Sequence, residues 1–244
     1  MHIYSYEADR SLEALKEKGY DIYIVMSQNS PFDVWMFGHM NKYFMVFMYI
    51  FPILAALPFA TSYCSEKKSG YVKNVVIRTS RKAYLKSKYW ATFISGGIAV
   101  AVPFFFSFMW IFTIMKYREP TPASQAPMVT GTSWMCELYF ENPFIYCLIF
   151  LVAIYVFGGF LATTSLSISQ LTDNFLTVLL VPFMVLTFLA SVLQGELSMY
   201  FLPLNFLAPM NDGNKFYMVL IGAMVMWVVS YGTFVVVGKK KDCF

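Results

Sequence analysis

The side chains best suited to bind or react with another molecule lie mainly in one charged stretch, residues 64–88. Its single carboxylate, Glu66, stands before a glycine and among many lysines and arginines, and apolar residues recur between the charges at helical spacing. Two kinds of recognition fit such an amphipathic helix. Anionic lipid headgroups attract it by ~1 kcal/mol per basic residue, or its apolar stripe enters a groove on a protein partner. The protein groove also accounts for Glu66 and Gly70, which lipid binding leaves unexplained.

Other residues that could support catalysis or metal binding form no convincing pattern. His2 and His39 lie far apart, and the four cysteines show no CxxC pair and no metal-ligand spacing with a histidine. Glu137 and Glu141 stand four apart, but a solvated loop face is the simpler interpretation. No GxxxxGK[ST] phosphate-binding loop occurs, so any ATP hydrolysis belongs to a partner. We therefore expect no enzyme, and no metal or other cofactor in this chain.

The sequence predicts that membrane-spanning helices flank the charged stretch. The 244-residue chain is 58% hydrophobic and only 13% charged, against about 25% in soluble domains. About 20 apolar residues cross the ~30 Å hydrocarbon layer as a helix, whereas the strands of membrane barrels alternate apolar and polar residues. The uncharged stretches therefore predict an all-α integral membrane protein with five transmembrane helices, at about 43–63, 89–115, 144–168, 175–193 and 216–237.

The distribution of basic residues predicts the orientation. We expect an extracytoplasmic N-terminal segment, 1–38, followed by one transmembrane domain, 39–244. With five crossings, the loop after the first span and the C-terminus share a side, and the positive-inside rule makes that side cytoplasmic. The basic residues there are Lys67, Lys68, Lys73, Arg78, Arg81, Lys82, Lys86, Lys88, Lys239, Lys240 and Lys241, whereas the outer loops carry only Lys116, Arg118 and Lys215.

Prolines and glycines inside the spans predict kinks and close helix packing. Pro52 and Pro58 remove backbone hydrogen bonds and should kink the first span. A very short inner turn around Asp173 joins the third and fourth spans, which predicts an antiparallel hairpin. Small residues in the second and third spans let neighbouring helices approach closely in lipid. These residues are Gly96, Gly97, Gly158 and Gly159.

At the charged stretch the sequence resembles the permeases of type-2 ABC exporters, in the small branch found in Gram-positive bacteria. The resemblance covers about residues 20–238. Its signature is Glu66-x-x-x-Gly70 followed by Arg78-Thr79-Ser80-Arg81-Lys82-x-Tyr84-x-x-x-Lys88. Family members have six spans and begin inside, whereas this sequence has five expected spans and opens in what corresponds to the outer segment before the second family span. We therefore expect that the first family helix is lacking from this sequence.

The resemblance implies a multi-pass permease of the bacterial cytoplasmic membrane that exports an amphiphilic or peptide cargo. It implies pairing with a second permease chain, identical or related, and docking of a separate ATPase subunit, the holder of ATP and Mg, on a cytosolic coupling helix between the first two spans. Membrane lipids are a further expected partner, and nucleic acid is not expected. The residues that the resemblance assigns to ATPase coupling are Glu66, Gly70, Tyr71, Val75, Arg78, Arg81 and Lys88.

Two other classes of protein compete with the exporter subunit. A membrane enzyme needs polar catalytic groups in or beside its spans, and the predicted spans contain no acid, base or histidine. A structural or immunity protein that acts without ATP stays open as the alternative. Copurification of a stoichiometric ATPase subunit separates that alternative from the exporter.

Overall fold

The computed structural model describes residues 30–37, 42–120, 129, 135–193 and 216–238. Every regular element in these residues is helical and none is a strand, which confirms the predicted all-α class for this part of the chain. Only residues 30–37 of the expected segment 1–38 are described, and both histidines lie outside the described residues. The elements are α3 (Pro31–Phe37), α4 (Lys42–Ala56), α5 (Ser62–Lys68), α6 (Tyr71–Arg78), α7 (Arg81–Ile114), α8 (Cys136–Glu141), α9 (Pro143–Ile168), α10 (Phe175–Val192), α13 (Phe216–Gly232) and the π-helical η2 (Thr233–Val237).

Four helices in the described residues are long and apolar enough to cross a membrane, so the chain is a multi-pass membrane protein. They are Arg81–Ile114, Pro143–Ile168, Phe175–Val192 and Tyr217–Val235. Each coincides with one of the last four expected spans. The first of them, α7, begins earlier than expected because Ser80 caps it, its Oγ accepting a hydrogen bond from the backbone N–H of Ala83 at 3.3 Å.

The first expected span, 43–63, is wrong as a single kinked helix. α4 ends at Ala56, and turns through Thr61 lead into the separate helix α5. Pro58 explains the break, since proline has no N–H to donate and disfavours helical backbone in the residue before it. With 15 residues, α4 is about 22 Å long, which is shorter than the hydrocarbon layer. Pro52, in contrast, lies inside α4.

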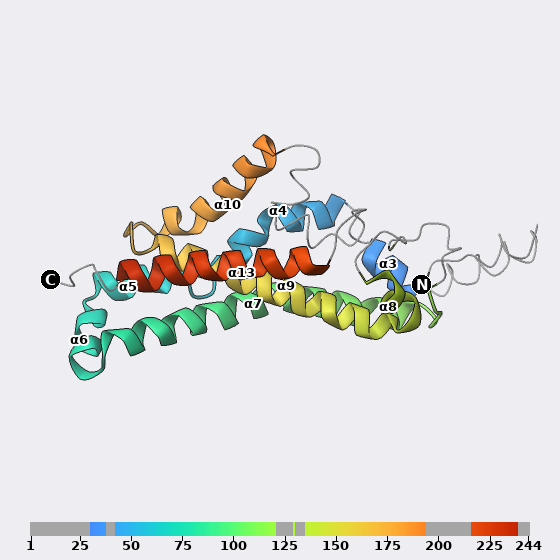
Figure 1. The fold of residues 1–244 in the computed structure, drawn as a ribbon, viewed down its shortest axis with the longest axis horizontal. Coiled ribbons are helices and arrows are strands. Elements are labelled where there is room, and N and C mark those ends of the chain that lie inside the picture. Colours follow the sequence, from blue (N-terminus) through green and yellow to red (C-terminus); the bar gives the residue numbers. More distant parts are fainter. Residues whose placement is uncertain (1–29, 38–41, 121–128, 130–134, 194–215, 239–244) are drawn as a thin grey trace, which may run out of the picture.

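α9 is the central helix of the bundle, and its closest neighbour is α7 (Figure 1). A Cβ built on Gly97 of α7 would lie 2.7 Å from the backbone oxygen of Tyr155, and a Cβ on Gly159 of α9 would lie 2.8 Å from the backbone oxygen of Phe93. The rings of Tyr155 and Phe93 lie equally near, and even if a ring moved aside the backbone oxygen would still block the added Cβ. The glycines therefore set the distance between the two helices, as the small residues of the sequence predict.

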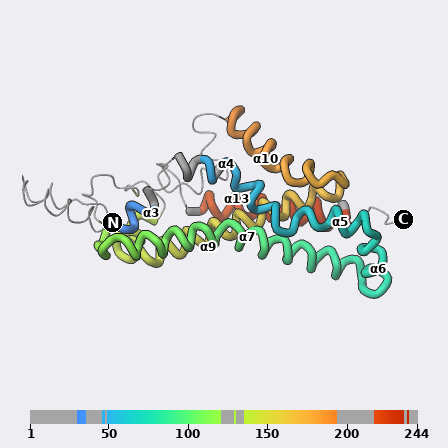
Figure 2. The backbone as a smooth tube through the Cα atoms, turned by 180° about the vertical axis from the view of Figure 1, so that it is seen from behind, coloured from blue at the N-terminus to red at the C-terminus, as the bar shows by residue number. Residues whose placement is uncertain are grey.

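The two ends of the bundle carry different elements. α5 and α6 lie at one end together with the C-terminal end of α13, whereas α3 and α8 lie at the other; Figure 2 shows the same arrangement from behind. The turn between α9 and α10 belongs to the first end, because Asp173 forms an ion pair of 2.5 Å with Lys67 of α5. Asn174 in this turn caps α10 by accepting from the N–H of Leu176 at 3.1 Å. We call the end with α5 and α6 the α6 end.

The last span finishes in a widened turn. η2 follows α13 directly, and the carbonyl oxygen of Ser230 accepts a hydrogen bond from the Ser167 hydroxyl of α9 at 3.0 Å. The Ser230 hydroxyl lies 2.8 Å from the hydroxyl of Tyr89 on α7. Interhelical hydrogen bonds of this kind join three spans near the α6 end.

The glycine contact between α7 and α9 can be tested by adding one methyl group. Gly97→Ala is expected to destabilise the fold by about 1–3 kcal/mol, because overpacking forces the two backbones apart. In the control, Gly232→Ala, the new Cβ meets nothing within 4 Å, and alanine favours helix over glycine by about 0.5–1 kcal/mol. Thermal unfolding of both variants and the wild-type chain, measured in the same detergent, should give a lower Tm for Gly97→Ala only. Equal Tm values would contradict the tight packing.

Candidate functional site

The candidate site is built from two helices that each present a pair of polar side chains. On α5, Ser62 and Glu66 are four residues apart, and on α7, Tyr84 and Lys88 are four apart. Residues at this spacing lie on the same face of a helix, one turn apart. α5 is free to turn its pair toward α7 because Pro58 separates it from α4. We call the four residues the Glu66 clamp.

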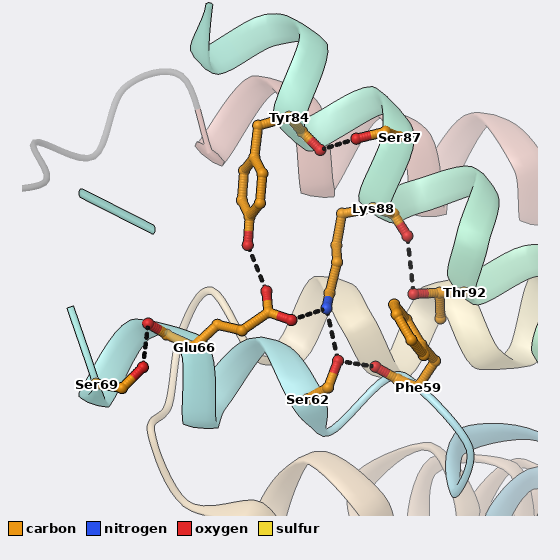
Figure 3. Close-up of polar contacts among 8 residues, drawn as sticks. All are labelled: Phe59, Ser62, Glu66, Ser69, Tyr84, Ser87, Lys88 and Thr92. Atoms are coloured by element: carbon orange, nitrogen blue, oxygen red, sulfur yellow. Dashed lines mark hydrogen bonds and ion pairs between the residues drawn. The ribbon is translucent and has the colours of Figure 1, made fainter. Parts of the chain in front are cut away.

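The geometry of the Glu66 clamp is shown in Figure 3. The Lys88 ammonium lies 2.6 Å from Oε1 of Glu66 and 2.6 Å from Oγ of Ser62, while the Tyr84 hydroxyl donates to Oε2 of Glu66. The ring of Phe59 covers the ammonium at 4.2 Å from its centroid, within the range of a cation–π interaction. Ser62 in turn donates to the Phe59 carbonyl oxygen at 2.8 Å.

Burial makes this ion pair different from a surface pair. The side chain of Lys88 is 4% exposed and that of Glu66 is 24% exposed. Taking an ammonium group out of water is costly unless an opposite charge and further hydrogen bonds compensate it. Both carboxylate oxygens of Glu66 accept hydrogen bonds, one from each residue of the α7 pair, so the orientation of the carboxylate is fixed. The Glu66 clamp therefore ties α5 to α7 at a defined angle.

α6 is the segment that the Glu66 clamp holds, because it connects α5 to α7. Gly70 precedes α6 with a φ of +74°, a left-handed conformation that favours glycine. Val72 is buried in a cluster with Leu85 and Tyr89, so one face of α6 rests on the bundle. The opposite face carries Tyr71 and Ile77, which are 52% and 83% exposed.

The structure separates the residues that the sequence assigns to ATPase coupling into two groups. Glu66 and Lys88 meet in the Glu66 clamp. Gly70, Tyr71, Val75 and Arg78 belong to α6 and the residue before it, where Val75 is half-buried and Arg78 exposed, and Arg81 is the half-buried first residue of α7. None of these five is a hydrogen-bond partner of Glu66 or Lys88 in the described contacts.

Three members of the site are missing from the coupling residues expected from sequence: Phe59, Ser62 and Tyr84. Tyr84 stands in the signature pattern, and its spacing of four from Lys88 is a signal that both face one partner. Ser62 has the same spacing from Glu66. Nothing in the sequence points to Phe59, since its position over Lys88 depends on the turn that follows Pro58.

A second buried polar cluster lies at the end opposite α6. Asp33 is 1% exposed, and its carboxylate accepts hydrogen bonds from the backbone N–H and hydroxyl of Ser30 at 3.1 and 2.9 Å and from the hydroxyl of Tyr139 at 2.7 Å. Burial, together with the hydrogen bond to this carboxylate, raises the pKa of Tyr139, so the phenol stays a donor. The cluster anchors α3 to α8 and offers no open site.

Chemistry beyond ion pairing finds little support in the described part of the chain. No group of three or more His, Cys, Asp or Glu residues there could hold a metal ion. Cys64 and Cys147 are buried free thiols. Burial, followed by the nearby charge of Asp173, raises the pKa of the Cys64 thiol, which disfavours the reactive thiolate.

Comparison with models of protein families, with curated proteins and with solved structures finds no match for the chain. Functional inference thus depends on its own sequence pattern and on the geometry of the Glu66 clamp.

The energetic weight of the Glu66 clamp can be measured with a double-mutant cycle. Glu66→Leu leaves the Lys88 ammonium buried without its counter-charge and is expected to cost about 3–5 kcal/mol of folding stability, and Lys88→Met should cost a similar amount. The double variant Glu66→Leu/Lys88→Met should be less destabilised than the sum, because no unpaired charge remains. Chemical unfolding in detergent gives the three values.

The matched control is the exposed pair of Lys67 and Asp173, whose side chains are 36% and 54% exposed. Removing either partner is expected to cost at most about 1 kcal/mol, since water screens the pair. Additive effects at Glu66 and Lys88 would show that the Glu66 clamp does not hold α5 to α7.

Proposed function

We propose that the chain is the membrane-spanning permease subunit of an ATP-driven exporter of the type-2 ABC class. The observation that carries this proposal is the Glu66 clamp, which fixes the helices on both sides of α6 while α6 itself lies at the end of the bundle. Glu66, Tyr84 and Lys88 are also three residues of the sequence signature on which the resemblance depends. In this arrangement a partner can push on the exposed helix α6, and the buried ion pair transmits the force to α5 and α7.

The exposed face of α6 suits a protein partner. Tyr71 and Ile77 expose large apolar surface beside Lys73 and Arg78, and interface cores are enriched in aromatic and arginine side chains. Val72 on the buried face keeps α6 seated on the bundle. In the proposal, a separate ATPase subunit covers the exposed face, and that subunit holds ATP and Mg.

The proposed topology has five crossings. α4 is short, but it is uncharged after its first residue, Lys42, and packs against α7, α9 and α10, so we assign the fifth crossing to it. The α6 end, with its lysines and arginines, lies in the cytoplasm together with the C-terminus, and the N-terminal segment lies outside. The membrane is the cytoplasmic membrane of a bacterium.

The proposed mechanism passes motion from α6 into the bundle. Closure of the ATPase subunits around ATP displaces α6, and the Glu66 clamp forces α5 and α7 to follow together. The glycine contact then passes the movement of α7 to α9, the central helix. A second permease chain completes the pathway for an amphiphilic or peptide cargo. Such coupling requires different contacts in the two states of the transporter.

Docking on α6 can be tested by coexpression with an ABC ATPase subunit from the same genome. Tagged wild-type chain should capture the ATPase subunit in stoichiometric amount. Tyr71→Ala/Ile77→Ala should weaken capture by at least about tenfold, because it truncates the exposed apolar residues of α6. The control Leu171→Ala removes an apolar residue at the same end that is 73% exposed, and it should leave capture unchanged.

Failure of the wild-type chain to capture any such ATPase subunit would overturn the exporter proposal. The alternative, a membrane protein that acts without ATP, would then account for the chain.

Coupling is a separate prediction from docking. Glu66→Gln and Gly70→Ala are expected to leave the ATPase subunit bound while cargo-stimulated ATP hydrolysis falls toward the unstimulated rate. The first variant removes the charge that holds Lys88. The second forces a Cβ into a left-handed conformation, at a cost of about 1–2 kcal/mol, although the Cβ itself meets nothing within 4 Å. Lys67→Ala, at the exposed pair, should retain full stimulation.

A further inference from the structure

One ridge of α7 changes its chemistry in an ordered way along the helix. Residues spaced by four along α7 form a continuous line on an α-helix, and every residue of this line is exposed from Lys82 to Ile114. The line begins with two lysines, continues with a tryptophan and then becomes apolar. Its members are Lys82, Lys86, Trp90, Ile94, Ile98, Val102, Phe106, Trp110 and Ile114.

The two tryptophans of this ridge are separated by the thickness of a hydrocarbon layer. Trp90 is 52% exposed and Trp110 is 64% exposed. They are 20 residues apart in one helix, which corresponds to about 30 Å. Tryptophan concentrates at both interfaces between membrane and water. The spacing therefore places one membrane boundary at each tryptophan, with only apolar ridge residues between them.

The two lysines lie just outside the boundary at Trp90. Along the helix axis, Lys86 is about 6 Å and Lys82 about 12 Å from Trp90, which is the depth of the lipid headgroups and their surface. Neither lysine forms an ion pair with a carboxylate of the described residues, since the ion pairs there are Lys67 with Asp173 and Lys88 with Glu66. Both ammonium groups are thus available to an anion that approaches from the lipid side.

We propose that this ridge binds the headgroup of an anionic phospholipid, with Lys82 and Lys86 contacting its phosphate and Trp90 lying beside its glycerol region. The acyl chains then follow the apolar ridge residues Ile94 and Ile98. The site is separate from the exposed face of α6. The basic residues of the α6 end therefore serve two partners, a lipid on α7 and a protein on α6.

The test uses the purified chain alone, so that its outcome is independent of any ATPase subunit. Native mass spectrometry from detergent measures how many phosphatidylglycerol molecules remain bound, with phosphatidylcholine as the neutral comparison. Lys82→Gln/Lys86→Gln should weaken phosphatidylglycerol binding by roughly 25-fold, about fivefold for each lysine. Phosphatidylcholine binding should not change, and inorganic phosphate should not displace the lipid.

The matched control is Lys68→Gln/Lys73→Gln, which removes the same charge from exposed positions of α5 and α6 at the same end. It should reduce phosphatidylglycerol binding by less than about twofold. An equal loss in both double variants would overturn the site, because only the overall positive field would then attract the lipid. Intact phosphatidylglycerol binding in Lys82→Gln/Lys86→Gln would also overturn it, because the two lysines would then not hold the headgroup.

Discussion

The ammonium group of Lys88 lies where water does not reach it, and it has to be compensated there. Glu66 supplies the opposite charge, Ser62 an acceptor oxygen and Phe59 the face of a ring. These three come from the segment that follows Pro58, so the compensation requires α5 to lie beside α7. The path of the chain between α4 and α7, and with it the position of α6, depends on this one electrostatic requirement.

The glycine contact between α7 and α9 extends that constraint into the bundle. Within a bilayer, moving an apolar side chain from lipid into a helix contact gains little free energy, because lipid tails are themselves apolar. Close packing and hydrogen bonds therefore hold the helices together. At Gly97 and Gly159 the facing backbone oxygens of Tyr155 and Phe93 lie so near that a displacement of one helix is passed directly to the other. The hydroxyls of Tyr89, Ser167 and Ser230 join the last span to the same pair of helices. α7 thus connects the α6 end to the centre of the fold.

Four spans could be predicted because a long uncharged stretch in lipid has few structures open to it besides a helix. The break after Ala56 could not, because Pro58 alone does not decide between a kink and a turn; that depends on the pairing of Glu66 with Lys88, 22 residues away. The pairing of Glu66 with Tyr84 depends equally on the angle between two helices. The hydrogen bond between Asp33 and Tyr139 is even harder to predict from sequence, since the two residues are 106 positions apart and no local pattern marks either of them.

The interruption at Pro58 also separates α5 mechanically from α4. A continuous helix resists twisting because each turn is bonded to the next, and here the proline has no N–H with which to continue that series. A torque applied to α5 therefore ends at the turn of residues 57–61 instead of rotating α4. Force on α5 can instead pass into α7 through the ion pair of Glu66 with Lys88, and into the turn between α9 and α10 through the ion pair of Lys67 with Asp173. Meanwhile α4 can keep its place among the surrounding lipids.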